Sequence, residues 1–545
     1  MAHVITQSCC NDASCLSVCP VNCIHPTPDE PDFATAEMLY IDPATCIDCG
    51  ACVDECPVSA IQPDDRLDAN NRIFLQLNAA YYTDHTPVRS KPVRAMHPAL
   101  ATELHVAIVG GGPAAFYAAD DLLRNPGVRV DMFERLPTPY GLVRAGVAPD
   151  HQSTKRVENA FAATAARSGF RYFLNTEVGV HVTHDELRER YHAVLYASGA
   201  STDRRLDVPG EDVPGSIAAT DFVAWYNGHP DYAGLEFDLS TPTAVIVGNG
   251  NVALDVARIL VSGPDRLART DIADHALDAL KRSNVTEVVV LGRRGVAQAA
   301  YTNAEFVAMG QIPCVDVIID PDGLVLDPST AAALAAGTLD STIAAKIRIA
   351  RDFADRTPTA GSRRIAFRYL VSPAEITGGS AVTSITCVRN EFTHTGGVVA
   401  TPVRSTVTTG IVIRAIGYRG RPIPPLPFDA ECAVVPNDRG AVTDEPGVYV
   451  AGWIKRGPSG GIGMNRLCGQ ETAGRILADH AAGLLESPIR SRDDIVELVV
   501  ARGGTPIDGD GWDRIDAHEK AAGRMAGRRR VKLVDRTDLE TAARP

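Results

Sequence analysis

The stretch GNGNVALDVARIL, residues 248–260, decides the fold of the chain. It follows the apolar run AVIV, residues 244–247, and continues into a helical pattern. A strand, a glycine-rich turn and a helix begin a βαβ unit that binds a dinucleotide. Gly248 and Gly250 let the main chain turn sharply beside a pyrophosphate, and the small Ala253 lets helix and strand pack closely. The alternative is a tight turn without a ligand, which the flanking strand and helix and a second copy upstream disfavour.

The end of the next strand indicates which dinucleotide is bound. The segment TEVVVLGRR, residues 286–294, ends in Arg293 and Arg294. An NAD site usually has a carboxylate there, which holds the ribose 2′-hydroxyl. Guanidinium groups instead suit a 2′-phosphate, which their planar fork can grip. The alternative is a solvated arginine pair on a loop; we interpret the pair as favouring NADP(H) over NAD(H).

The upstream copy begins at Leu104, where the sequence HVAIVGGGPAAFYAADDLL again predicts strand, turn and helix. Gly110 and Gly112 occupy the small positions of the turn. The following strand, residues 128–134, ends in Glu134, about 20 residues on, where ribose hydroxyls are held. This copy therefore favours a dinucleotide without a 2′-phosphate, and FAD fits. An FAD unit followed by an NADP unit is typical of a flavoprotein reductase, which needs no nucleophile or catalytic triad.

Nine of the 13 cysteines lie between positions 9 and 56. They form two runs that share the C-x2-C-x2-C-x3-C-P spacing, except that Asp12 replaces the second cysteine of the first run. This spacing is typical of bacterial iron–sulfur proteins, in which the fourth cysteine ligates the other cluster. Zinc also binds C-x2-C pairs, but two runs that each end in Cys-Pro favour iron–sulfur clusters. Residues 1–65 therefore resemble a bacterial two-cluster ferredoxin.

The ferredoxin resemblance implies two sets of cluster ligands. The set of Cys9, Cys15 and Cys56 has only three thiolates, which suit a 3Fe–4S cluster. Weak ligation by Asp12, or a shift of the fourth ligand to Cys10, would permit 4Fe–4S. Cys23 belongs to neither run and is expected to pack beside a cluster. The implied ligands are Cys46, Cys49, Cys52 and Cys19 for one cluster and Cys9, Cys15 and Cys56 for the other.

Charge and composition exclude several classes of protein. Residues 1–65 carry no Lys or Arg and 11 carboxylates, a net charge of −11, whereas the whole chain carries −14, so that the other 480 residues carry −3. This distribution argues against nucleic-acid binding and predicts docking on a basic surface, for which Arg89, Lys91, Arg94, Lys455 and Arg456 are candidates. No apolar run is long enough to span a membrane and no signal-peptide pattern is seen, which predicts a cytoplasmic protein, expected to be a monomer.

Residues 104–470 resemble the adrenodoxin-reductase type of ferredoxin–NADP reductase. The resemblance is carried by GGGPAAFYAA, YGLVRAGVAPDH, GNGNVALDVARIL, GRRG, IGYRGRPI and GWIKRGPSGGIG. With the ferredoxin head, the whole chain resembles the actinobacterial fusion of ferredoxin and ferredoxin–NADP reductase. One departure is GGIGMN where the family usually has GVIGTN, which affects the fit around Gly461 and Met464.

The resemblance also implies site residues. Those for FAD are Ala114, Glu134, Leu142, Val178, Trp453, Gly460, Gly461 and Ile462. Those for NADP are Asn249, Gly250, Asn251, Val252, Arg293, Arg294, Glu305 and Gly460. His151 and Asp255 are implied as a proton-handling pair near the flavin.

The expected architecture is α/β: a small α+β ferredoxin domain followed by two Rossmann-like domains. We expect a ferredoxin domain over 1–65, a linker over 66–103 with a strand at residues 73–77, and an FAD domain split into 104–205 and 411–545. The NADP domain, 206–410, is inserted, with a helical insertion at 262–284. In the polar tail from residue 486, we expect the arginine cluster of residues 528–530 to lie at a solvated helix end.

The expected activity is electron transfer from NADPH through FAD to iron–sulfur clusters, and from there to a ferredoxin or a haem monooxygenase. One alternative is the small subunit of NADPH-dependent glutamate synthase, which also combines FAD and NADP units with clusters. A second alternative is a redox sensor that uses its clusters as a switch.

Overall fold

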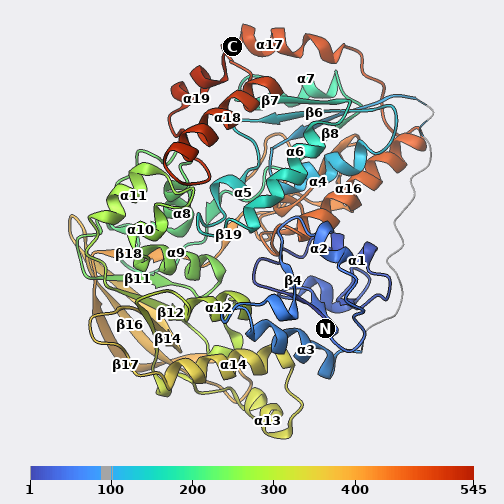
Figure 1. Cartoon of the computed structure of the whole chain (residues 1–545). Coiled ribbons are helices and arrows are strands. Elements are labelled where there is room, and N and C mark those ends of the chain that lie inside the picture. The colour runs from blue at the N-terminus through green and yellow to red at the C-terminus, as the bar shows by residue number, and fades with distance from the viewer. Residues whose placement is uncertain (1, 87–99, 101) are drawn as a thin grey trace.

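The computed structural model describes residues 2–86, 100 and 102–545, which form a head and two sheet domains (Figure 1). The sheet of the first domain has seven strands in the order β20-β21-β22-β8-β5-β6-β7 and takes them from two distant parts of the chain. Its core strands are parallel, with β5 between β8 and β6. The strands are β5 (Leu104–Val109), β6 (Val128–Glu134), β7 (Phe170–Leu174), β8 (Ala193–Tyr196), β20 (Asn437–Asp438), β21 (Ala441–Val442) and β22 (Val448–Val450).

The sheet of the second domain has six parallel strands in the order β10-β18-β11-β12-β14-β13. After their first residue, its central strands β11 and β12 are apolar and buried, as expected of strands covered on both faces. The strands are β10 (Ser216–Ala218), β11 (Thr243–Val247), β12 (Glu287–Gly292), β13 (Val315–Ile319), β14 (Arg363–Tyr369) and β18 (Ile411–Arg414).

Helices and a small antiparallel sheet cover these two sheets. In the first domain, α4 packs against both α6 and α16, which comes from the C-terminal part of the chain. One face of the second sheet is covered by β15-β16-β17, whose apolar side chains share a core with β11 and β12. The elements are α4 (Pro113–Leu122), α6 (Glu158–Ala165), α16 (Met464–Ala481), α8 (Ala219–Tyr226), α9 (Asn251–Val261), α12 (Asn303–Met309), α14 (Ser341–Ala354), β15 (Val371–Gly378), β16 (Val382–Phe392) and β17 (Val398–Thr408). Among the described residues, no helix is both long and apolar enough to cross a membrane.

The two glycine turns and the helical insertion are formed as predicted. Each turn connects a central strand to a helix, β5 to α4 and β11 to α9. The insertion contains α10 (Pro264–Leu267) and α11 (Asp274–Lys281).

The predicted return of the chain to the first domain at residue 411 is wrong. Strand β18 pairs with β10 and β11 and therefore completes the second sheet. The chain leaves that sheet only after Arg414, and β19 (Tyr418–Arg419) pairs with β9 (Thr202–Asp203) between the domains. An apolar strand carries no local signal of the sheet in which it lies.

The head is built from short strands and helices that hold the cysteine loops. Strand β1 pairs with β4 and β2 pairs with β3, all antiparallel. The elements are β1 (His3–Ile5), β2 (Ile24–His25), β3 (Tyr40–Ile41), β4 (Ile61–Pro63), α1 (Ser14–Val18) and α2 (Ala51–Glu55).

The strand predicted at residues 73–77, within a linker, is instead part of helix α3 (Ile73–Asp84). Its buried side chains, among them Phe74, Leu77 and Tyr81, recur at helical spacing. Asn78 accepts hydrogen bonds from the main-chain N–H groups of Ile5 and Ile41, 3.2 and 2.9 Å away. One side chain thus ties α3 to both β1 and β3, and the helix belongs to the head.

The acidic head meets basic groups of the reductase, as its charge predicts. Arg466 lies 3.2 Å from Asp12, and Lys346 lies 3.3 Å from Glu37. Lys455, which was predicted to dock the head, instead donates a hydrogen bond to Glu471.

The neighbouring candidate Arg456 also bonds within the reductase. Arg456 bonds Ser459 and Asn465. Arg89, Lys91 and Arg94 lie outside the described residues.

The C-terminal tail packs against the first domain through buried charges, so the prediction of a solvated arginine cluster is wrong. Arg530, whose side chain is 3% exposed, donates to Glu519 at 2.9 Å. Glu519 is fully buried and also accepts from Arg144 at 2.6 Å. The tail helices are α17 (Ile495–Ala501), α18 (Gly509–Met525) and α19 (Arg536–Ala543).

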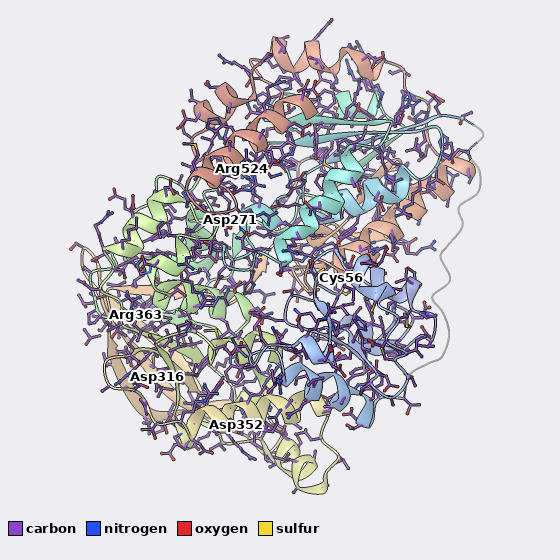
Figure 2. The ribbon with its side chains drawn as sticks, viewed as in Figure 1. Cys56, Asp271, Asp316, Asp352, Arg363 and Arg524 are labelled. Atoms are coloured by element: carbon purple, nitrogen blue, oxygen red, sulfur yellow. The ribbon has the colours of Figure 1, made fainter. Side chains whose placement is uncertain are left out.

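A second buried charge cluster joins both domains and the tail. Asp271, labelled in Figure 2 where the second domain meets the first, lies 2.8 Å from Lys155 and 3.2 Å from Lys532. All three side chains are at most 3% exposed. Asn227 accepts a further hydrogen bond from each lysine. One carboxylate therefore compensates two buried ammonium groups that come from different parts of the chain.

Replacing Asp271 by Asn should lower the free energy of unfolding by about 3–5 kcal/mol, because two buried lysines then lack a counter-charge. The matched control is Asp278→Asn, which removes a carboxylate that is 57% exposed and pairs with Lys281; this change should cost less than about 1 kcal/mol. Chemical denaturation of both variants measures the difference, and equal stability would contradict the account.

Candidate active site

The first glycine turn leaves open space at the N-terminus of α4. At Gly110, φ is +109°, and a Cβ would lie 2.6 Å from the carbonyl oxygen of Ala197. At Gly112, a Cβ would meet nothing within 4 Å, so the main chain is accessible where the helix N–H groups point. Glu134 at the end of β6 accepts the Gly111 N–H at 2.7 Å, and burial raises the pKa of this carboxyl. These features fit the pyrophosphate and ribose of a dinucleotide such as FAD.

Most of the other residues implied for FAD are brought to this turn. Leu142 follows Gly141, which packs against Gly112, and it begins α5 (Leu142–Ala145). Trp453 follows Gly452, which packs against Ala114, and it begins α15 (Trp453–Arg456).

The glycine-rich loop before α16 is tied to the same place. Asn465 donates to the carbonyl oxygen of Gly461 at 3.0 Å and lies close to Gly452. Gly460 and Ile462 are the neighbours of Gly461 in the chain and are therefore held at the same place. Val178, in the loop after β7, is half-buried and packs against the apolar cluster that contains Ala107 of β5 and Phe133 of β6.

The second turn has the same construction. At Gly248, φ is +112°, and a Cβ would lie 2.2 Å from the carbonyl oxygen of Ala415. Gly250 precedes α9, and Asn251 in the first turn of that helix accepts the Thr302 N–H at 2.9 Å. The side-chain amide of Asn249 packs against Gly292 at the end of β12. Val252, in the first turn of α9, is half-buried.

Arg293 and Arg294 follow β12 and are exposed. Within the described part of the chain, neither guanidinium group takes part in a hydrogen bond or ion pair; only the main-chain carbonyls of the two residues accept hydrogen bonds, from Asn390 and Leu370. Both forks are therefore available to a 2′-phosphate of NADP(H).

Replacing both Arg293 and Arg294 by Ala should lower kcat/KM for NADPH by on the order of a hundredfold or more, because two charge-assisted contacts are lost. The value for NADH should change little. Arg348→Ala, on the exposed side of α14, is the matched control and should leave both values unchanged. Equal losses with the two cofactors would overturn the assignment.

His151, Asp255 and Glu305 meet where the two domains face each other. The His151 Nε2 atom lies 3.6 Å from Glu305 Oε2 and 3.9 Å from Asp255 Oδ1. Buried Arg258 donates to Asp255 at 2.6 Å and to Asp150 at 2.7 Å. The implied His151–Asp255 pair is thus close but not hydrogen-bonded, and Glu305 is the nearer carboxylate.

Two residues of this cluster were not anticipated from sequence. Arg258 lies three positions after Asp255 on the same helix, so helical spacing could have indicated it. Gln7 comes from the head and donates to Glu305 Oε2 at 3.0 Å, and no local pattern predicts such a contact.

The cysteines separate into two groups. Burial, with smaller contributions from nearby Cys56 and Asp12, raises the pKa of Cys9 to about 12. Burial and the charges of Cys9, Asp12 and Cys56 likewise raise the pKa of Cys15. Cys10 adjoins the same group. Thiols in such surroundings become thiolates when a cation compensates them, so this group fits a cluster that contains iron.

The second group lines a pocket within the head. It contains the four predicted ligands Cys19, Cys46, Cys49 and Cys52. Cys23 also lines the pocket, with its sulfur 3.5 Å from that of Cys19, which agrees with a neighbouring rather than a separate role. Four thiols around one pocket fit a 4Fe–4S cluster.

Two family models match the chain. The model for pyridine nucleotide-disulphide oxidoreductases matches residues 104–294, and that for 4Fe-4S binding domains matches residues 39–62. A solved structure of Mycobacterium tuberculosis FprA in complex with NADPH has a TM-score of 0.76 and 44% identity, covering 81% of this chain and 99% of that chain.

Curated relatives show the same relationship, one of them over the whole length of this chain. NADPH-ferredoxin reductase FprA of Mycobacterium tuberculosis is 46% identical and covers 80% of this chain and 98% of its own length. A probable ferredoxin/ferredoxin–NADP reductase of Mycobacterium leprae is 48% identical over 559 residues, covering 100% of this chain and 98% of its own length. The chain therefore belongs to the family of ferredoxin/ferredoxin–NADP reductases, in which a ferredoxin head is joined to an FprA-like flavoprotein reductase.

Proposed function

We propose that this chain takes electrons from NADPH and delivers them singly through its own head to a protein acceptor. The observation that carries the proposal is the contact between head and reductase. The main-chain oxygen of Cys10, in the first cysteine loop, accepts the N–H of Gly463, which directly follows the glycine-rich loop 460–462. Donor and acceptor modules are therefore joined at the loop implied for the flavin.

Each part of the site has a defined task in this proposal. Arg293 and Arg294 bind the 2′-phosphate of NADPH, and Glu134 binds the FAD ribose. The N-terminus of α9 and that of α4 each hold a pyrophosphate. When bound, FAD accepts a hydride as two electrons and passes these on one at a time, which iron–sulfur clusters require.

The His151 cluster lies at the boundary of the domains and is proposed to handle the proton that accompanies the electrons. Glu305 lies 3.6 Å from His151, and Arg258 holds Asp255 in place at 2.6 Å. Gln7 joins this cluster from the head side, because its side-chain amide donates a hydrogen bond to Glu305.

The head is proposed to hold two clusters. Cys19, Cys46, Cys49 and Cys52 would ligate a 4Fe–4S cluster. Cys9, Cys15 and Cys56 would ligate the other, as 3Fe–4S, or as 4Fe–4S if Cys10 or Asp12 supplies a fourth ligand. The final acceptor is proposed to be a ferredoxin or a haem monooxygenase, and the protein to act as a cytoplasmic monomer.

Neither alternative function is favoured by a specific observation. The full-length relatives carry the reductase name, which supports the reductase over a glutamate synthase subunit. A redox sensor that uses its clusters as a switch would not need to turn over NADPH, so NADPH turnover distinguishes it from a reductase.

Absorption and EPR spectra of the purified protein, recorded before and after anaerobic addition of NADPH, test the proposal. The flavin bands should bleach and the signals of reduced clusters should appear in the same sample. NADH at equal concentration is the control and should act much more slowly. Bleaching of the flavin without any reduction of the clusters would contradict the proposed path.

A further inference from the structure

Asp12, which replaces a cysteine in the first run, is held by groups of the protein. Its Oδ1 atom accepts the Ser14 N–H at 3.2 Å, and its Oδ2 atom accepts the Ser14 hydroxyl at 2.6 Å. Arg466 of α16 donates to Oδ2 at 3.2 Å and to the main-chain oxygen of Asp12 at 2.9 Å. The same guanidinium also bonds the Ser14 hydroxyl. Both carboxylate oxygens are therefore engaged by groups of the protein.

The ion pair is shielded from solvent. The Asp12 side chain is 11% exposed and that of Arg466 is 23% exposed. A charge-assisted hydrogen bond in such a place is stronger and less screened than a surface pair. It can therefore fix the position of a loop.

The main chain beside Asp12 lies directly on α16. A Cβ at Gly463 would lie 2.1 Å from the carbonyl carbon of Asn11 and 2.3 Å from the nitrogen of Asp12. Such an approach is possible only where position 463 has no side chain. The Cys10–Gly463 hydrogen bond, 2.8 Å long, lies at the same place. The first cysteine loop thus touches the reductase next to the loop implied for the flavin.

Figure 2 agrees with this placement. Cys56, a member of the first cysteine group, is labelled at the edge of the head that faces the first domain.

The second cysteine group lies differently. Its pocket is lined only by head residues, and Cys49 is exposed. In the described ranges, no hydrogen bond or ion pair joins residues 46–52 to the reductase; Asp48 pairs with His3 inside the head. The first group therefore lies against the reductase, whereas the second is enclosed by head residues and reaches solvent at Cys49.

We infer that Asp12 is a docking residue and not an iron ligand, and that its bond to Arg466 makes the first cluster the acceptor nearest the flavin. This inference rests on the proposed function. NADPH loses a hydride and becomes NADP⁺, and a proton is released. The two electrons then pass singly through the first cluster and the second, and reduce two one-electron acceptors.

Three variants test the inference: Asp12→Asn, Arg466→Gln and the double variant. Asp54→Asn, an exposed head carboxylate, is the matched control for the lost charge. Stopped-flow reduction by NADPH gives the rate of cluster reduction, and ferricyanide reduction reports the flavin alone. Iron content and EPR of the oxidised protein report ligation, and amide exchange of residues 9–15 reports docking.

Each single variant should slow cluster reduction about tenfold or more, because a charge-assisted contact is lost. The double variant should be no slower than the slower single variant, because both changes remove the same contact. Amide exchange in residues 9–15 should rise in all three variants. Iron content, EPR and ferricyanide reduction should match those of the native protein and of Asp54→Asn.

Other outcomes overturn the inference. Loss of iron or a changed EPR signal in Asp12→Asn, but not in Arg466→Gln, would make Asp12 a ligand. Native rates of cluster reduction in both single variants would remove the docking role. Should Asp12→Asn fail to fold, Arg466→Gln and the conservative Arg466→Lys test the same contact from the reductase side. Failure of NADPH to reduce the clusters of the native protein would instead overturn the proposed function itself.

Discussion

The contact between the first cysteine loop and the start of α16 is the constraint on which the arrangement of the molecule depends. Electrons pass between the modules only if the head is held against the loop implied for the flavin. Gly463 permits that approach, because any side chain there would overlap the main chain of Asn11. The hydrogen bond to Cys10 and the Asp12–Arg466 pair then fix the register. Helix α3, packed against α14, holds the opposite side of the head.

One buried charge cluster fixes the two reductase domains relative to each other, and a second holds the tail on the first domain. Asp271 binds lysines from the first domain and from the tail, and Glu519 binds Arg144 and Arg530. Removing one partner of such a cluster leaves an uncompensated charge, so a shift of one domain is costly. The His151 cluster lies across the same boundary and depends on this alignment, because Arg258 reaches both Asp150 and Asp255.

Features with a local signal were predictable from sequence. The two glycine turns need particular residues at fixed spacing, and the cysteine runs place ligands within a few residues. Helix α3 was missed because its short apolar stretch also fits strand alternation, and its helical face appears only over a longer window. The contacts of Gln7, Arg466 and Asp271 join residues that are far apart in the sequence. The pairing of β18 with β11 in the second sheet is likewise a contact between distant residues. Nothing in a local window encodes such contacts.

The most direct measurement of the central claim, that the head receives electrons from its own reductase, is the dependence of cluster reduction on protein concentration. Native protein is mixed anaerobically with excess NADPH at several concentrations, and the reduction of flavin and clusters is followed separately. We expect a constant first-order rate of cluster reduction, because donor and acceptor are docked within one chain. A rate that rises in proportion to protein concentration would contradict it and show that electrons pass between molecules.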